Sequence, residues 1–173
     1  MRTGSWGAGI HNFRDSDIFL AVGNNPMVSS YSPLGGLQGT DPFTKMREAK
    51  KRGMKLIVID PRKTEFASSA DIHLQPIPGE DPTLLAGIFN LIFKNSVYDH
   101  DFCDKWVELS ALNSLIDSVS RFTPEYVSKR CDIDQGEMIE AALMFANEVN
   151  GGAGTGTAPS ICLLYTTDAA DDT

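Results

Sequence analysis

The sequence has little of what several function classes require. No apolar run approaches the roughly 20 residues that a membrane-spanning helix needs, so we expect no membrane span in this chain. The net charge is -8, and because nucleic-acid binding requires clustered positive charge, we expect no nucleic-acid partner. Only 3 cysteines occur, and their wide spacing argues against a zinc site, an iron–sulfur site and a disulfide framework. We expect Cys103, Cys131 and Cys162 to be free, buried or half-buried thiols.

The remaining composition is typical of one globular domain. Hydrophobic residues make up 42% and charged residues 22% of the chain, and 173 residues are enough to enclose one core. Residues 162–173 differ, because they follow no helical or strand period and resemble the in-frame translation of a sequencing-library adapter. We therefore expect residues 1–161 to be one α/β domain truncated at both ends, and residues 162–173 to be a non-native tail.

Two apolar runs frame a strand–helix–strand unit. Residues 17–22 and 55–60 are continuous apolar runs followed by turn residues, a pattern typical of buried parallel strands. Between them, Asp41-Pro42 forms a helix start and Gly53 is a good helix terminator. This order predicts a right-handed βαβ unit. A short third strand is expected at residues 71–75.

The second half of the chain is mainly helical in pattern. Apolar residues recur at helical spacing over residues 84–94. Thr123-Pro124 begins one further helix, and Asp134 with Glu137 resembles a capping box for a helix that reaches Val149. Short helices are expected at residues 101–107 and 111–119, and the glycine run 151–157 leads towards another strand. The sequence thus predicts an α/β fold, a Rossmann-like parallel sheet flanked by helices, as an incomplete domain.

The first loop that could carry chemistry follows the first strand. It contains Gly23, Asn24, Asn25 and Pro26, with the hydroxyls of Ser29 and Ser30 nearby. In open α/β sheets ligands bind beyond the carboxyl ends of the strands, and glycine lets a backbone approach a ligand closely. Amide groups and hydroxyls can bind phosphate or sugar oxygens there. Taken alone, this segment is more simply an ordinary turn.

The second loop follows the second strand and contains Asp60, Pro61, Arg62 and Thr64. The Asp60 carboxylate can accept hydrogen bonds from a ribose or from guanine N–H groups, and Arg62 can donate two hydrogen bonds to phosphate. An equally good interpretation is that Asp60 caps the next turn and that Arg62 is a solvated charge.

The third loop contains Gly79, Glu80 and Asp81 and leads into a helix. Asp81 as the helix N-cap is the simpler interpretation, and the alternative is that the loop's amides or a carboxylate face a nucleotide base. No segment matches G-x-G-x-x-G after a strand, which counts against a dinucleotide dehydrogenase.

The combination of these segments, in this order along the chain, identifies a protein family more specifically than any one segment does. Asp-Ile-Phe-Leu-Ala-Val-Gly-Asn-Asn-Pro lies at 17–26, Ile-Asp-Pro-Arg-Lys-Thr at 59–64, Ala-Asp-Ile-His-Leu at 70–74 and Pro-Gly-Glu-Asp at 78–81. Gly-Ser-Trp-Gly at 4–7, Phe-Thr-Pro-Glu at 122–125 and Gly-Thr-Gly-Thr at 154–157 accompany them. Over nearly all of the chain before the tail, this combination resembles the large subunit of the molybdopterin-dependent oxidoreductases of the dimethyl-sulfoxide-reductase and formate-dehydrogenase type.

The resemblance implies a bis(molybdopterin guanine dinucleotide) cofactor and electron-transfer redox chemistry at molybdenum. It implies that residues 23–26, with Ser29 and Ser30, lie along the pyrophosphate and ribose of one dinucleotide. Residues 60–64 would hold its guanosine end, and residues 79–81 would complete the guanine pocket. The implied partners are a small-molecule substrate and an iron–sulfur electron-transfer subunit.

Two family landmarks have no counterpart in this sequence. The cysteine motif for an iron–sulfur cluster and the segment that supplies the protein ligand of molybdenum are both expected upstream of Arg2. We therefore nominate no catalytic residue and no metal ligand, and we expect the chain by itself to be inactive. The alternatives are a cofactor-free relative such as the large iron–sulfur subunit of respiratory complex I, and a generic Rossmann-like nucleotide-binding module. The polar Asn-Pro and Asp-Pro-Arg loops favour the enzyme.

Overall fold

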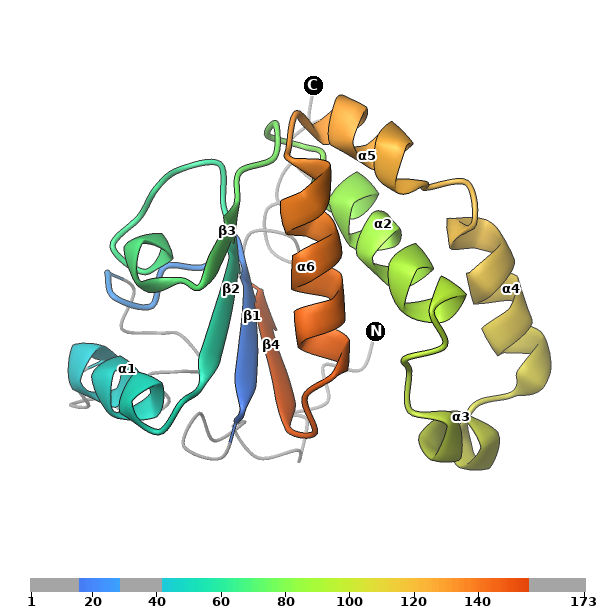
Figure 1. Ribbon diagram of the computed structural model, residues 1–173, viewed down its shortest axis with the longest axis horizontal. Coiled ribbons are helices and arrows are strands. Elements are labelled where there is room, and N and C mark those ends of the chain that lie inside the picture. The colour runs from blue at the N-terminus through green and yellow to red at the C-terminus, as the bar shows by residue number, and fades with distance from the viewer. Residues whose placement is uncertain (1–15, 29–41, 156–173) are drawn as a thin grey trace, which may run out of the picture.

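The computed structural model describes residues 16–28 and 42–155, which form a parallel sheet between layers of helices (Figure 1). The described strands are β1 (Ile18–Val22), β2 (Lys55–Ile59), β3 (Ile72–Leu74) and β4 (Gly151–Thr155). They are arranged in the order β3-β2-β1-β4, and every neighbouring pair is parallel. The α/β class and the parallel sheet are thus as the sequence predicts.

Helices cover both faces of this sheet (Figure 1). One face carries α1 (Pro42–Lys51) and the short 3-10 helix η2 (Ala67–Ser69). The other face carries α6 (Gln135–Ala146), and α2 (Asp81–Lys94) and α5 (Pro124–Cys131) pack with it. The helices α3 (His100–Trp106) and α4 (Leu109–Val119) lie outside α2, farthest from the sheet.

Two hydrophobic clusters hold these layers together because successive strand residues point to opposite faces. The cluster under α1 contains Phe19, Ala21, Met46, Ala49, Met54, Leu56, Val58, Phe66 and Ala67. The cluster under α6 and α2 includes Ile18, Leu20, Ile57, Ile59, Leu84, Ile88, Val127 and Met138. Because β1 and β2 are buried on both sides, their sequences are continuous apolar runs instead of alternating ones.

The sequence interpretation was wrong about the glycine run, which is a strand and not the approach to one. Gly151–Thr155 form β4, which pairs along β1 from Ile18–Gly151 to Val22–Thr155. Glycine normally weakens a strand, which is why the run looked like a loop. Here a Cβ atom on Gly154 would stand 2.9 Å from Cζ of Phe19, so the strand lies too close to that ring for a larger residue.

The helix starts follow local capping chemistry. The Thr123 hydroxyl accepts a hydrogen bond from the backbone N–H of Tyr126, and Asp134 accepts one from Glu137, as the sequence predicts. The last helix ends at Ala146, before the expected Val149, because the chain must turn there to enter β4.

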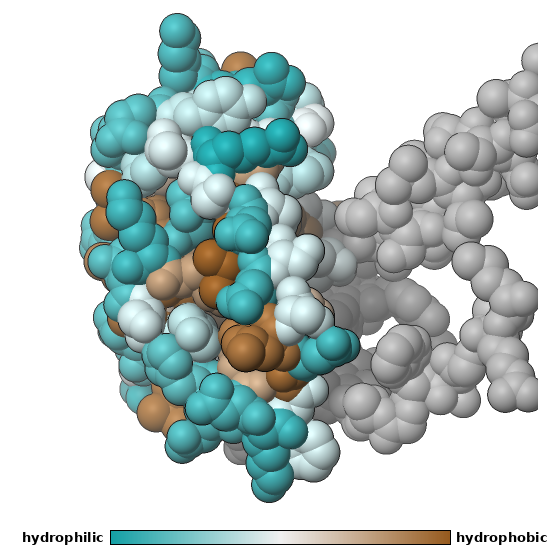
Figure 2. Space-filling view, turned by 90° about the vertical axis from the view of Figure 1, so that its right-hand side faces the viewer, coloured by the Kyte–Doolittle hydropathy of each residue, from teal (hydrophilic) through white to brown (hydrophobic). Residues whose placement is uncertain are grey.

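The outer face made by α3 and α4 carries apolar side chains among hydrophilic ones (Figure 2). Phe102, Trp106 and Leu109 are all more than half exposed, and Val119 is the buried residue of α4. This outer pair of helices is therefore held by fewer buried groups than the layers next to the sheet. None of the helices in the described ranges is both long and apolar enough to cross a membrane.

Candidate functional site

The carboxyl ends of the parallel strands define one edge of the sheet, at the top in Figure 1. The loops that follow β1, β2 and β3 all begin at this edge. In parallel α/β sheets this is where ligands bind, because loops and helix N-termini converge there. The nominated residues that the structure describes lie on these three loops or at the start of α2, whereas Ser29 and Ser30 lie outside the described residues.

The loop after β1 turns sharply over the end of β2. Gly23 has a φ of +56°, a left-handed conformation that glycine adopts without strain, and its N–H donates to the Ile59 carbonyl at 2.8 Å. Asn24 and Pro26 are buried, and Asn25 is half-buried. The backbone is thus fixed close to the strand ends, where it can approach a ligand.

The loop after β2 presents a buried carboxylate beside an exposed guanidinium. Asp60 is 4% exposed, and its Oδ1 accepts a hydrogen bond from the backbone N–H of Arg62 at 2.8 Å. The Arg62 side chain is 80% exposed, with its Nε 3.8 Å from the same Oδ1. Asp60 therefore does shape the turn, as the simpler interpretation held, while Arg62 extends towards solvent and is available to an anionic ligand.

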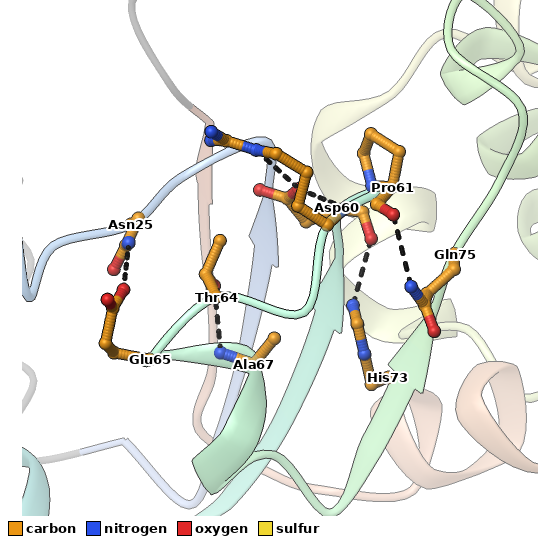
Figure 3. A network of polar contacts seen from close by, with 9 residues as sticks. Asn25, Asp60, Pro61, Thr64, Glu65, Ala67, His73 and Gln75 are labelled. Atoms are coloured by element: carbon orange, nitrogen blue, oxygen red, sulfur yellow. Dashed lines mark hydrogen bonds and ion pairs between the residues drawn. The ribbon is translucent and has the colours of Figure 1, made fainter.

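Thr64 supports the same turn from inside. It is buried, and its Oγ1 accepts a hydrogen bond from the Ala67 N–H at 3.1 Å, at the start of η2 (Figure 3). Its carbonyl accepts a second hydrogen bond, from the Ser68 hydroxyl. The hydroxyl that the sequence analysis nominated for the cofactor is therefore directed to the protein backbone, because it caps the turn that follows.

A side-chain hydrogen bond joins the first two loops. Nδ2 of Asn25 donates to Oε2 of Glu65 at 2.9 Å (Figure 3), and this bond, with a contribution from Arg62, holds the pKa of Glu65 below its ordinary value. The other end of the Asn25 amide, Oδ1, is buried and has no hydrogen-bond partner among the residues that the structure describes. A buried acceptor without a partner is uncommon and calls for an explanation.

Residues of β3 and the segment after it fasten the second loop to the sheet. His73 Nε2 lies 2.9 Å from the Asp60 carbonyl, and the Gln75 side-chain amide donates to the Pro61 carbonyl at 3.1 Å (Figure 3). The Asp60 N–H donates to the Leu74 carbonyl. These three hydrogen bonds fix the backbone of Asp60 and Pro61.

The third loop starts at the same edge but is tied to α5. Glu80 accepts hydrogen bonds from Arg130 at 2.9 Å and from the Thr83 hydroxyl at 2.7 Å. The Ile77 N–H donates to the Cys131 carbonyl, and Gly79 has a φ of +95°. The Glu80 carboxylate is thus occupied within the protein, which leaves mainly the backbone of this loop to meet a ligand.

Asp81 is not the N-cap of α2. It is the first residue of the helix, and the N-cap position belongs to Glu80, whose side chain makes no capping hydrogen bond. The interpretation of Asp81 as the N-cap was therefore wrong by one residue. Glu80 occupies the N-cap position, and its carboxylate pairs with Arg130 instead of capping the helix. Asp81 remains favourably placed as an acid in the first turn of a helix.

The described cysteines are free, as the sequence predicts. Burial raises the pKa of Cys131 to about 11, so its thiol stays protonated and unreactive at neutral pH. Among residues 16–28 and 42–155, no group of three or more His, Cys, Asp or Glu side chains could hold a metal ion.

The Glu80–Arg130 pair predicts a measurable change in ionisation. The hydrogen bond from Arg130 holds the pKa of Glu80 below its ordinary value of 4.5, so the pair stabilises the folded chain above that pH and ceases to do so as the pH falls through the lowered pKa. We expect Arg130→Ala to raise the Glu80 pKa towards 4.5 in a carboxyl NMR titration. Lys129→Ala is the control and should leave that pKa unchanged; equal effects of the two substitutions would contradict the pairing.

Sequence reasoning missed Glu65, His73, Gln75 and Arg130. The one signal available for Glu65 was its place in the same loop as Asp60 and Thr64. Its contact with Asn25 spans 40 residues and depends on the parallel pairing of β1 with β2. Arg130 could not be found from the sequence because it lies in α5, and the three helices α2, α3 and α4 separate it from Glu80 in the chain.

No family model matches the chain. The chain is 33% identical over 138 residues to the alpha subunit of the F420-dependent formate dehydrogenase of Methanocaldococcus jannaschii, covering 80% of this chain and 19% of that subunit. It is 34% identical over 137 residues to the acetylene hydratase of Syntrophotalea acetylenica, covering 79% of this chain and 17% of that protein.

Similarity to a solved structure agrees with these sequence matches. The acetylene hydratase of Pelobacter acetylenicus matches with a TM-score of 0.72 and 31% sequence identity, over 85% of this chain and 19% of that chain. The chain therefore spans less than a fifth of the length of the relatives described here.

Proposed function

The chain belongs to the molybdopterin-dependent oxidoreductases of the dimethyl-sulfoxide-reductase and formate-dehydrogenase type, and we propose that it holds one guanine dinucleotide arm of their bis(molybdopterin guanine dinucleotide) cofactor. When bound, that cofactor supplies redox chemistry at molybdenum. The whole enzyme would act on a small-molecule substrate and exchange electrons through an iron–sulfur cluster outside this chain and an iron–sulfur partner subunit. The residues described here bind and orient the nucleotide and take no part in the redox step.

The observation that carries this proposal is the buried Asp60 carboxylate beside the exposed Arg62 guanidinium at the edge where parallel sheets bind ligands. Guanine presents adjacent N–H donors on one edge, and a carboxylate accepts such donors. A guanidinium is well matched to phosphate oxygens because it donates two parallel hydrogen bonds. The two groups therefore suit the two chemically different ends of a guanine nucleotide.

The other loops fit the same ligand. The turn at Gly23 brings backbone to the strand ends, and the unpartnered Oδ1 of Asn25 is a buried acceptor that a ligand donor would satisfy. The Gly79 loop adds backbone groups and the N-terminus of α2, which favours negative charge. Thr64 supports this site through the turn, and Glu80 supports it through Arg130.

The proposal predicts that Asp60→Asn weakens binding of GDP by about 10- to 100-fold, the loss expected when one charged hydrogen-bonding group is removed. Asparagine keeps an Oδ1 that can accept from the Arg62 N–H, so the turn should survive while the acceptor facing guanine becomes a donor. Isothermal titration of GDP into the chain measures this effect.

Two controls separate binding from folding and guanine from other bases. Asp104→Asn, an exposed position on α3, should bind GDP as the unsubstituted chain does. ADP should bind more weakly than GDP, because adenine lacks the paired donors. An unsubstituted chain that shows no GDP binding would refute the proposal and favour a cofactor-free relative, and equal affinity for GDP and ADP would favour a generic nucleotide-binding module.

A further inference from the structure

Glu65 connects the loop after β1 with the loop after β2. Its Oε2 accepts a hydrogen bond from Nδ2 of Asn25 at 2.9 Å (Figure 3), across 40 residues of sequence. The bond from Asn25, together with the backbone N–H of Glu65 and the charge of Arg62, lowers the pKa of Glu65. The carboxylate is therefore ionised at neutral pH and acts only as an acceptor.

This contact fixes which end of the Asn25 amide faces away from Glu65. An asparagine amide has an NH2 donor end and an oxygen acceptor end, and an ionised carboxylate can bond only with the donor end. Rotating the amide by half a turn would place Oδ1 against the carboxylate, with two acceptors in repulsive contact. Oδ1 of Asn25 is consequently the end of the amide that does not bond to Glu65; it is buried and has no partner within the described ranges.

We infer that Glu65 is a positioning residue that presents Oδ1 of Asn25 to the bound nucleotide as an acceptor, and that this point of the site selects a ribose hydroxyl over a phosphate oxygen. The inference rests on the function proposed above and specifies what the first loop recognises. Phosphate oxygens at neutral pH mainly accept hydrogen bonds, so an amide oxygen gains nothing from facing them. A ribose hydroxyl donates, and it would satisfy the buried Oδ1 atom.

The test compares GDP with 2′,3′-dideoxy-GDP by isothermal titration into the chain. The unsubstituted chain should bind GDP about 5- to 10-fold more tightly than the dideoxy form, the difference that one neutral hydrogen bond supplies. In Glu65→Ala the amide of Asn25 is free to rotate, so this ratio should fall towards one. Glu65→Gln retains an oxygen that can accept from Nδ2 and should restore most of the ratio, while Glu140→Ala, exposed on α6, should leave it intact.

A second measurement tests the contact without any nucleotide. In NMR spectra of the free chain, the side-chain amide signal of Asn25 should move as Glu65 titrates below its ordinary pKa, and this dependence should vanish in Glu65→Ala. GDP binding with an unchanged ratio in Glu65→Ala, or an Asn25 signal insensitive to that substitution, would overturn the positioning role alone. No GDP binding by the unsubstituted chain would overturn both this inference and the proposed function.

Discussion

Truncating Phe66 to alanine should lower the free energy of unfolding by about 3–5 kcal/mol, the largest stability effect we expect from one substitution in this chain. Phe66 is fully buried in the cluster under α1, where it lies with Phe19, Met46 and Val58. Removing its ring eliminates buried apolar contacts and leaves a cavity that the surrounding strands cannot close. A native domain has only about 5–15 kcal/mol of stability to lose, so much of the chain would unfold under mild denaturant.

The same substitution should also weaken nucleotide binding. Phe66 follows Glu65 directly and begins the turn into η2, so it anchors the loop that carries Asp60 and Arg62. Urea unfolding followed by circular dichroism measures the stability change, with Phe102→Ala as the matched control. Phe102 is 55% exposed on α3, and its truncation should change stability by less than about 0.5 kcal/mol. Equal losses in the two variants would show that Phe66 does not occupy a packed core.

Gly154→Ala should destabilise the chain by about 1–3 kcal/mol, although alanine normally suits a folded backbone better than glycine. The added Cβ would stand 2.9 Å from Cζ of Phe19, a ring that is itself only 2% exposed and has little room to move. It would also come within 3.7 Å of the Asn24 side chain. Relief of the clash therefore requires a shift of β4 or of Phe19, next to the first loop of the site.

Gly151→Ala on the same strand provides the comparison. A Cβ at Gly151 would meet Phe145 at 3.5 Å, which is ordinary van der Waals contact, so the substitution should be neutral or slightly stabilising. Thermal or urea unfolding of both variants measures the difference. If Gly154→Ala were as stable as Gly151→Ala, the close approach of β4 to Phe19 would be refuted.

The sequence predicts most of the fold because the elements near the sheet have strong local signals. Continuous apolar runs mark β1 and β2, and cap-and-proline pairs mark the start of α5. The strand β4 has no such signal. It is rich in glycine, and the space at Gly154 is limited by Phe19, a neighbour more than 130 residues away in the chain. Packing across the sheet overrode the ordinary preference of glycine for loops.

For the candidate site, the sequence indicates the loops but not the contacts between them. Each loop follows a strand or opens a helix, so its place at one sheet edge follows from parallel topology. The bonds from Asn25 to Glu65 and from Arg130 to Glu80 depend on side chains brought together by tertiary packing, over separations of 40 and 50 residues. No periodicity in the sequence records such pairs. The N-cap of α2 was placed at Asp81 instead of Glu80, because Glu80 is engaged by Arg130 from another helix.

We propose that the turns after β1, β2 and β3 bind a single guanine nucleotide together. Adding GMP to the ¹⁵N-labelled chain and following its backbone amides by NMR tests this most directly. We predict that the signals of Gly23, Arg62 and Gly79 move together along one saturation curve, while those of α3 and α4 stay in place. Signals that do not move, or that move in only one loop or with different affinities, would contradict it.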